Sequence, residues 1–210
     1  MVKTRADFQE RVNLIRRGQH LQYFTIGWNS LEGLAAITAG LIAGSISLVG
    51  FGFDSLIEVT SGSAALWRVL SDDNEINRER VERLSLKIVG ICFLALAAYI
   101  GYGAIISLVQ HRIPEKSIFG IIVAITSLIT MPLLAHSKRR IGTAIGSAAV
   151  TADARQTEFC VYLSAILLLG LLHNALFGLW WADAVAAFIM VPLIAKEGVD
   201  AVLGKTCIYC

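Results

Sequence analysis

The sequence predicts an all-α, polytopic membrane protein with six transmembrane helices. Its composition is the first observation: 56% of the 210 residues are hydrophobic and only 16% are charged, whereas a typical soluble domain carries about 25% charged residues. The second is that the apolar residues gather in runs of about the 20 residues that a helix needs to cross a bilayer. Six such runs lie near residues 22–46, 49–70, 87–109, 117–136, 147–173 and 179–203.

The distribution of Lys and Arg predicts the orientation. Of the 18 Lys and Arg residues, all but Arg112 and Lys116 fall in the N-terminal arm, the loops after the second and fourth runs, and the tail. Because cytoplasmic loops are enriched in Lys and Arg, both termini are expected in the cytoplasm. We expect an integral protein of the bacterial inner (plasma) membrane. The net charge of +2 is too small to indicate a nucleic-acid partner.

The expected elements follow in order. Residues 1–20 form a charged cytoplasmic arm, which lacks the apolar core of a signal peptide. Residues 21–203 form one six-helix transmembrane domain, and residues 204–210 form a short cytoplasmic tail. Within the domain, the mixed charges of residues 71–85 indicate a short cytoplasmic helix that extends the third run. Aromatic residues between the fifth and sixth runs suit a water–lipid interface.

Two acids interrupt the second run. Asp54 and Glu58 lie four residues apart, so they are about 40° apart around a helix and face one direction. A charge at mid-bilayer costs about 2.5–3.5 kcal/mol on insertion scales, and neither acid has a basic neighbour in sequence. The acids are therefore either protonated and hydrogen-bonded to other helices, or compensated by a bound cation.

Two other runs carry polar residues on one side. Asn29 and Glu32 lie close together around the first helix, and Asp153, Gln156 and Cys160 lie within about 60° of one another around the fifth. Carboxylates, an amide oxygen and a thiol together favour a site for a divalent cation.

Other polar and sulfur residues are interpreted as structural. Glu158 points away from the stripe on the fifth helix and is expected to pair with Arg155, and Asp183 is expected to cap the sixth helix. Cys92 is expected in the core. The terminal pair Cys207 and Cys210 is either an inert tail, which we favour, or a capture site for a soft metal ion. We assign no histidine to the site; the four are His20, His111, His136 and His173.

These features resemble the cation diffusion facilitator family of metal/proton antiporters over about residues 20–203. The segment from Asp54 to Glu58 is similar to the paired acids of the family's second helix, and Trp181-Ala182-Asp183 resembles the start of its sixth. On the fifth helix the family has His-x-x-x-Asp; aligning Ala152-Asp153 puts Gln156 and Cys160 at those two positions. These two differences indicate a divergent branch of the family. The family resemblance as a whole implies a homodimer. The family usually continues into a cytoplasmic metal-binding domain, which we expect to be absent because the chain ends at GKTCIYC.

The resemblance implies proton-coupled export of a divalent transition metal cation. We expect zinc, with Cd²⁺, Fe²⁺, Co²⁺ and Mn²⁺ as other candidates, and no resident cofactor. The predicted ligands are Asp54, Glu58, Gln156 and Cys160, with Glu32 and Asp153 as weaker candidates.

The residues are also compatible with one other function and resemble, in part, a second. One is a non-transporting metal-binding or regulatory membrane subunit with the same fold, and it stays open. The other is an enzyme: GFGFD is similar to the Gly-x-Gly-Asp signature of intramembrane aspartyl proteases, but it is one residue too long. The second Tyr-Asp partner of those enzymes is missing, so we do not expect an enzyme.

Overall fold

The computed structural model describes residues 5–70 and 75–203. These residues form six α-helices and no strand. The helices are α1 (Arg5–Ala43), α2 (Ile46–Leu70), α3 (Glu75–Val109), α4 (Ile118–Ile145), α5 (Ala148–Phe177) and α6 (Ala182–Val202). The predicted tail and its pair Cys207 and Cys210 lie outside the described residues. The all-helical prediction is therefore confirmed for this part of the chain.

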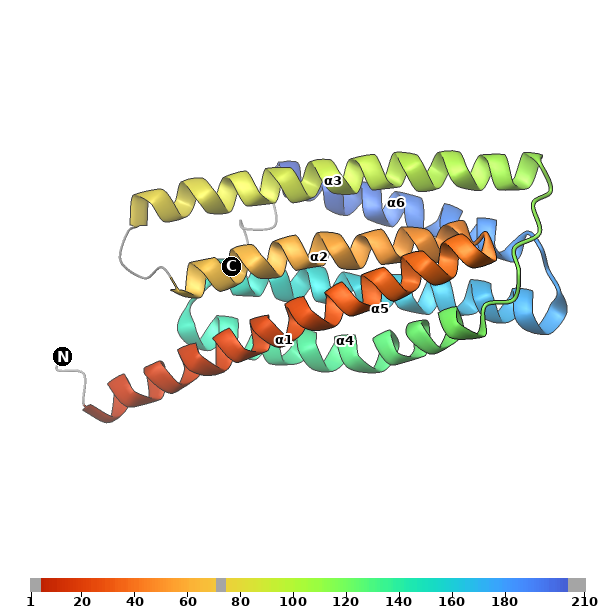
Figure 1. The fold of residues 1–210 in the computed structure, drawn as a ribbon. Helices are drawn as coiled ribbons and strands as arrows, with labels where there is room; N and C mark the ends of the chain where they lie inside the picture. The colour runs from red at the N-terminus through yellow and green to blue at the C-terminus, as the bar shows by residue number, and fades with distance from the viewer. Residues whose placement is uncertain (1–4, 71–74, 204–210) are drawn as a thin grey trace.

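The helices run up and down in one elongated bundle (Figure 1). The first residues of α1, the last of α2, the first of α3 and the α4–α5 connection lie at one end, which we call the N-terminal end. The α1–α2, α3–α4 and α5–α6 connections lie at the opposite end. Helix α2 is central, because it packs against α1, α3, α5 and α6. Helix α4 packs against α1 and α5, and α3 pairs with α6. This places α1, α2, α4 and α5 around a common interior.

At the tight turns, serine residues cap the starts of helices and glycine residues follow their ends. Ser117 and Ser147 are the N-caps of α4 and α5, since each side chain accepts a hydrogen bond from a backbone N–H in the first turn. Gly44, Gly146 and Gly178 each have φ between 65° and 66°, a left-handed conformation that favours glycine at a helix end. These short connections make the consecutive helices antiparallel.

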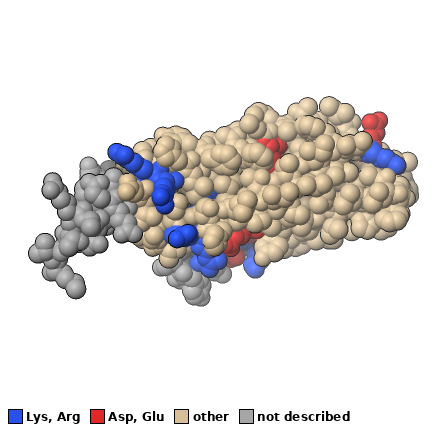
Figure 2. All heavy atoms as spheres, turned by 90° about the horizontal axis from the view of Figure 1, so that it is seen from below, with Lys and Arg blue, Asp and Glu red and all other residues tan. Residues whose placement is uncertain are grey.

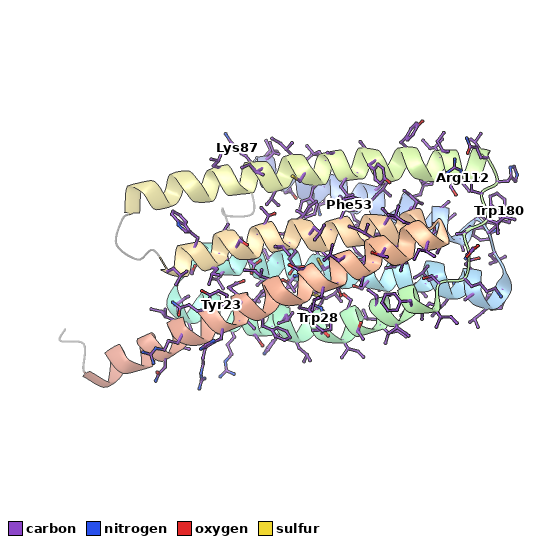
Figure 3. The ribbon with its side chains drawn as sticks, viewed as in Figure 1. Tyr23, Trp28, Phe53, Lys87, Arg112 and Trp180 are labelled. Carbon is purple, nitrogen blue, oxygen red and sulfur yellow. The ribbon has the colours of Figure 1, made fainter. Side chains whose placement is uncertain are left out.

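Two helices extend beyond the predicted spans. The charged arm is not a separate segment, because α1 is continuous from Arg5 and its 39 residues are about 58 Å long. Helix α3 begins at Glu75, which confirms the predicted helical extension of the third run. In Figure 3, Lys87 lies on α3 toward the N-terminal end, and Arg112 and Trp180 lie at the opposite end.

The outer surface is apolar along most of its length, and polar side chains lie inside. On the face in Figure 2, the Lys and Arg side chains lie near the N-terminal end and at the opposite end, with few charges between. Large exposed apolar residues occur on α1, α3, α4 and α5, among them Leu41, Tyr102, Leu133 and Tyr162. Such a surface is typical of a protein that faces lipid.

Among residues 5–70 and 75–203, three helical segments are long and apolar enough to cross a membrane: Lys87–Val109, Ile118–Ile145 and Val150–Phe177. Helices α1, α2 and α6 carry buried polar residues such as Glu32, Glu58 and Asp183, which lower their hydropathy. The expectation that Cys92 lies in the core is wrong, since it is exposed on α3. Its helix has a lipid-facing side that sequence hydrophobicity does not distinguish from a core-facing one.

Glycines bring α1 and α2 close together. A Cβ atom on Gly40 would lie 2.8 Å from the backbone nitrogen of Val49, and one on Gly52 would lie 2.9 Å from the carbonyl oxygen of Gly33. Side chains larger than hydrogen do not fit at such distances, so the small residues set the spacing of the two helices. This close approach places Glu32 of α1 beside Ser55 of α2.

Candidate functional site

The two acids of α2 face α5 in the interior of the bundle. Asp54 and Glu58 are both 0% exposed, and Cys160 of α5 is 1% exposed. The Cys160 Sγ atom lies 3.0 Å from Asp54 Oδ2 and 2.9 Å from Glu58 Oε2. The structure therefore brings together three of the four predicted ligands, Asp54, Glu58 and Cys160, which we call the thiol–carboxylate cluster.

A neutral thiol cannot satisfy both contacts of this cluster. Cys160 has one S–H hydrogen, so it donates to only one of the two carboxyl oxygens at a time. The other short contact requires a hydrogen on that carboxyl group or a cation between the groups, because two anionic oxygens and sulfur repel at this separation. At these separations the cluster therefore needs a further hydrogen or a positive charge.

Lys138 of α4 gives Glu58 a charged partner. Its side chain is fully buried, and Nζ lies 3.2 Å from Glu58 Oε1 and 2.9 Å from Asp153 Oδ2. Nζ also donates to Thr157 Oγ1 over 2.7 Å, and the Thr157 hydroxyl donates to Glu58 Oε1. Sequence reasoning counted Lys138 among loop charges of the N-terminal end; the structure corrects this, because the residue lies inside α4 and points into the bundle.

Asp153 belongs to the same network but not to the thiol–carboxylate cluster. Its Oδ2 atom accepts from Gln22 Nε2 of α1 over 2.9 Å, and its Oδ1 atom accepts from Ser61 Oγ of α2 over 3.3 Å. With the Lys138 contact, Asp153 links α1, α2, α4 and α5. Its oxygens are thus already engaged by three protein donors.

The remaining predicted residues make no hydrogen bond to the thiol–carboxylate cluster among the described residues. Glu32 accepts from Ser55 Oγ over 3.1 Å through Oε2, while its Oε1 has no hydrogen-bond partner among the described residues. Gln156 is buried, and in the same part of the chain no hydrogen bond joins it to Asp54, Glu58 or Cys160; its Nε2 has no partner. The amide of Asn29 is likewise buried without a partner within the described ranges.

The structure gives two acids partners that the sequence did not predict. Asp183 does not cap its own helix: it accepts from Ile46 N over 2.9 Å and from the hydroxyls of Ser45 and Ser47, so it stabilises the N-terminus of α2. Glu158 forms an ion pair with Arg139 of α4, with Nη1 and Oε1 3.2 Å apart; its expected pairing with Arg155 stays a prediction. Both contacts join residues far apart in sequence.

The thiol–carboxylate cluster is too compact to hold a metal ion without adjustment. Zinc–sulfur and zinc–oxygen bonds of about 2.3 and 2.1 Å at a tetrahedral angle separate sulfur and oxygen by about 3.6 Å, whereas the present contacts are 2.9 and 3.0 Å. Consistent with this, the described residues contain no group of three or more His, Cys, Asp and Glu arranged as a metal site. Opening each contact by about 0.6 Å is the change that a tetrahedral zinc ion requires.

Sequence reasoning missed Lys138, Thr157 and Gln22. Thr157 follows Asp153 by four residues, and this spacing places it on the same face of α5. Lys138 precedes Arg139 and Arg140, so in the sequence it has the pattern of a loop charge. In the structure it lies two turns before the end of α4 and is buried in the bundle.

An apolar helical bundle with buried carboxylates, a thiol and an ammonium group inside defines a polytopic membrane protein with a polar interior. The chain belongs to the cation efflux family, because the sequence profile of the cation efflux transmembrane domain matches residues 24–203. The matched residues include about half of α1 and the other five helices, and therefore the network around Lys138 except Gln22.

Three curated relatives are similar over most of the chain. An uncharacterized transporter of Methanocaldococcus jannaschii is 28% identical over 181 residues, which is 83% of this chain and 64% of that protein. Transmembrane protein 163 of Xenopus laevis is 26% identical, over 95% of this chain and 71% of that protein. Magnetosome protein MamB of Paramagnetospirillum magneticum is 25% identical, over 78% of this chain and 57% of that protein. The matches thus span between 57% and 71% of the length of these relatives.

Proposed function

We propose that this protein exports a divalent transition metal ion, with zinc preferred, in exchange for protons. The observation that carries the proposal is the Cys160 thiol between the buried carboxyl groups of Asp54 and Glu58. Membership of the cation efflux family supports a metal cation as the substrate, and one relative is named a transporter.

The same three side chains hold either protons or the metal ion. Without metal, hydrogens on sulfur and oxygen stabilise the short contacts; when metal binds, these hydrogens leave and the ion bridges the thiolate and the two carboxylates. A thiolate selects soft or borderline ions such as zinc and cadmium, while the oxygens accept harder ions such as manganese. Gln156 and Glu32 are buried but make no hydrogen bond to these three side chains among the described residues, and they become additional ligands only if the helices move.

Proton exchange also fits the energetics of export. Moving a 2+ ion outward against 100 mV, inside negative, costs about 4.6 kcal/mol, and each proton that returns contributes about 2.3 kcal/mol. The groups that lose protons when metal binds inside regain them outside, and this displaces the ion.

For the topology, we propose that all six helices cross the bacterial plasma membrane, with both termini in the cytoplasm, and that the protein is a homodimer. Exposed basic residues lie in the N-terminal half of α1 (Arg16, Arg17) and in the last two turns of α4 (Arg139, Arg140), and these parts of the two helices lie toward the N-terminal end of the bundle. Arg112 and Lys116 lie in the α3–α4 connection, at the other end. The basic excess at the N-terminal end supports its cytoplasmic location.

The proposal is tested with purified protein in liposomes. Zn²⁺, Cd²⁺, Mn²⁺ and Fe²⁺ uptake is measured with and without an imposed pH gradient, and internal pH is followed in the same vesicles. We expect zinc flux that the gradient accelerates, with matched proton movement in the opposite direction. Flux of zinc without proton movement contradicts the exchange mechanism, and metal binding without any flux contradicts transport.

The second candidate function is a non-transporting metal-binding or regulatory subunit. The observation in its favour is the ammonium group of Lys138 against Glu58, because a cation already present offsets part of the charge that attracts metal. The liposome experiment separates the two functions: a regulatory subunit binds zinc through Cys160 but moves none across the membrane.

A further inference from the structure

Lys138 is a full positive charge placed on one of the proposed metal ligands. It lies 3.2 Å from Glu58 and 2.9 Å from Asp153, and all three side chains are at most 1% exposed. Removing an ammonium group from water costs several kcal/mol unless it is paired and hydrogen-bonded. Here two carboxylates and the Thr157 hydroxyl provide that compensation.

The two carboxylates that contact Lys138 differ in their other partners. Glu58 is shared, since its Oε1 atom faces Lys138 and its Oε2 atom faces Cys160. Asp153 is not part of the thiol–carboxylate cluster and is fixed by Gln22 and Ser61. Lys138 can therefore lose its contact with Glu58 and still keep an ion pair with Asp153.

We propose that Lys138 is a tethered counter-cation that competes with the transported metal ion for Glu58, and that Asp153 is the anion that retains it when metal binds. The proposal rests on the function proposed above and adds a residue that sets the affinity for the ion. In the metal-free protein the ammonium group neutralises Glu58; a divalent ion at Oε2 repels it toward Asp153. The competition keeps binding weak enough for the ion to leave.

This arrangement predicts opposite effects on metal affinity from a single and a double variant. In Asp153→Asn, Lys138 loses the carboxylate that holds it away, so it pairs only with Glu58 and metal binding weakens. In Lys138→Met combined with Asp153→Asn, both charges of the pair are gone and Glu58 faces the metal alone, so binding becomes tighter than in the wild type. Removing one partner of a buried ion pair is destabilising, so a thermal melt of each variant accompanies the binding measurement and shows that the protein is folded.

The experiment is a Cd²⁺ titration of the full-length protein in detergent at one pH, read from the ultraviolet absorbance of the cadmium–thiolate bond. Cys160→Ser supplies the blank for the other cysteines. We expect Asp153→Asn to bind Cd²⁺ about tenfold more weakly and the double variant about tenfold more tightly than wild type, changes within the energy of a buried ion pair. Arg139→Met is the matched control, because it removes a neighbouring but 68% exposed positive charge, and it should leave the affinity unchanged.

The outcomes are distinct. If Asp153→Asn weakens binding and adding Lys138→Met does not restore it, Asp153 is a metal ligand and the counter-cation is rejected. If both variants bind Cd²⁺ like the wild type, Lys138 is only structural. If the wild type gives no thiolate absorbance that Cys160→Ser removes, the metal site itself, and with it the proposed function, is wrong.

Discussion

Two buried acids in this molecule, Asp183 and Asp54, differ in how many hydrogen-bond donors surround them. Asp183, near the end of the bundle opposite the N-terminus, accepts hydrogen bonds from the Ser45 and Ser47 hydroxyls and from the backbone N–H of Ile46. Asp54, deeper in the bundle on α2, has one hydrogen-bond partner among the described residues, the Cys160 thiol, and its Oδ1 atom has none. Both carboxyl groups are at most 1% exposed.

The difference separates a structural acid from a candidate ligand. The donors around Asp183 match a carboxylate, and the N-terminal dipole of α2 adds to them, so the group is stable as it stands. Asp54 has acceptor sites that no donor in the described chain fills, which costs free energy unless a proton or cation compensates it. An acid retained in such surroundings is typical of a site that binds something.

Glu58→Gln should have the largest effect on function. The amide keeps a carbonyl oxygen for Lys138 and Thr157, and Lys138 keeps Asp153, so the melting temperature should change little. Loss of a group that only orients a metal ligand lowers metal affinity roughly 10–100-fold. Because Glu58 is a proposed ligand itself, zinc affinity should fall by more than this. Zinc flux with and without a pH gradient, beside a thermal melt, measures both. A folded Glu58→Gln protein with wild-type flux would contradict the proposed mechanism.

Asp54→Asn and Asp183→Asn test the comparison directly. Asp183→Asn replaces charged hydrogen bonds worth about 1.5–3 kcal/mol each, so the melting temperature should fall while the folded fraction binds zinc normally. Asp54→Asn should do the reverse, with lower zinc affinity at unchanged stability. Calorimetric titration measures the zinc affinity of both proteins, and thermal melts measure their stability. An equal loss of zinc affinity in both variants would contradict the distinction between a structural acid and a metal ligand.

Cys160→Asp should change which metal ion the protein prefers more than it changes the overall affinity for metal. An oxygen in place of sulfur favours harder ions, so preference should shift from cadmium and zinc toward manganese, by about tenfold on the scale of other changes around a metal ion. Competition binding on purified protein measures the order of affinities. If cadmium keeps its lead over manganese, Cys160 does not contact the metal.

Cys92→Ser should have the smallest effect. Cys92 is exposed on α3, away from the interior that α1, α2, α4 and α5 enclose, so zinc affinity should not change and stability should change by less than about 0.5 kcal/mol. The same titration and melt check this. A loss of binding in Cys92→Ser would place a metal ligand outside the thiol–carboxylate cluster.

The sequence alone determined the class of the protein and the acids at its centre. Six apolar runs and a strong bias of Lys and Arg follow from the physics of a bilayer, which acts on each helix separately. The four-residue spacing of Asp54 and Glu58 and the polar stripe with Cys160 also needed only helical periodicity. For that reason the sequence indicated which faces of α2 and α5 meet.

The tertiary structure decided which partners those acids have. Lys138 is 80 residues from Glu58 and Ser45 is 138 residues from Asp183, so no local pattern predicts either contact. The packing of α4 against α5 places an apparent loop lysine inside the bundle, and the crossing of α2 and α6 makes Asp183 a cap for another helix. Compensation of a buried charge depends on what is close in space, and in a helical bundle that is set by how separate helices pack.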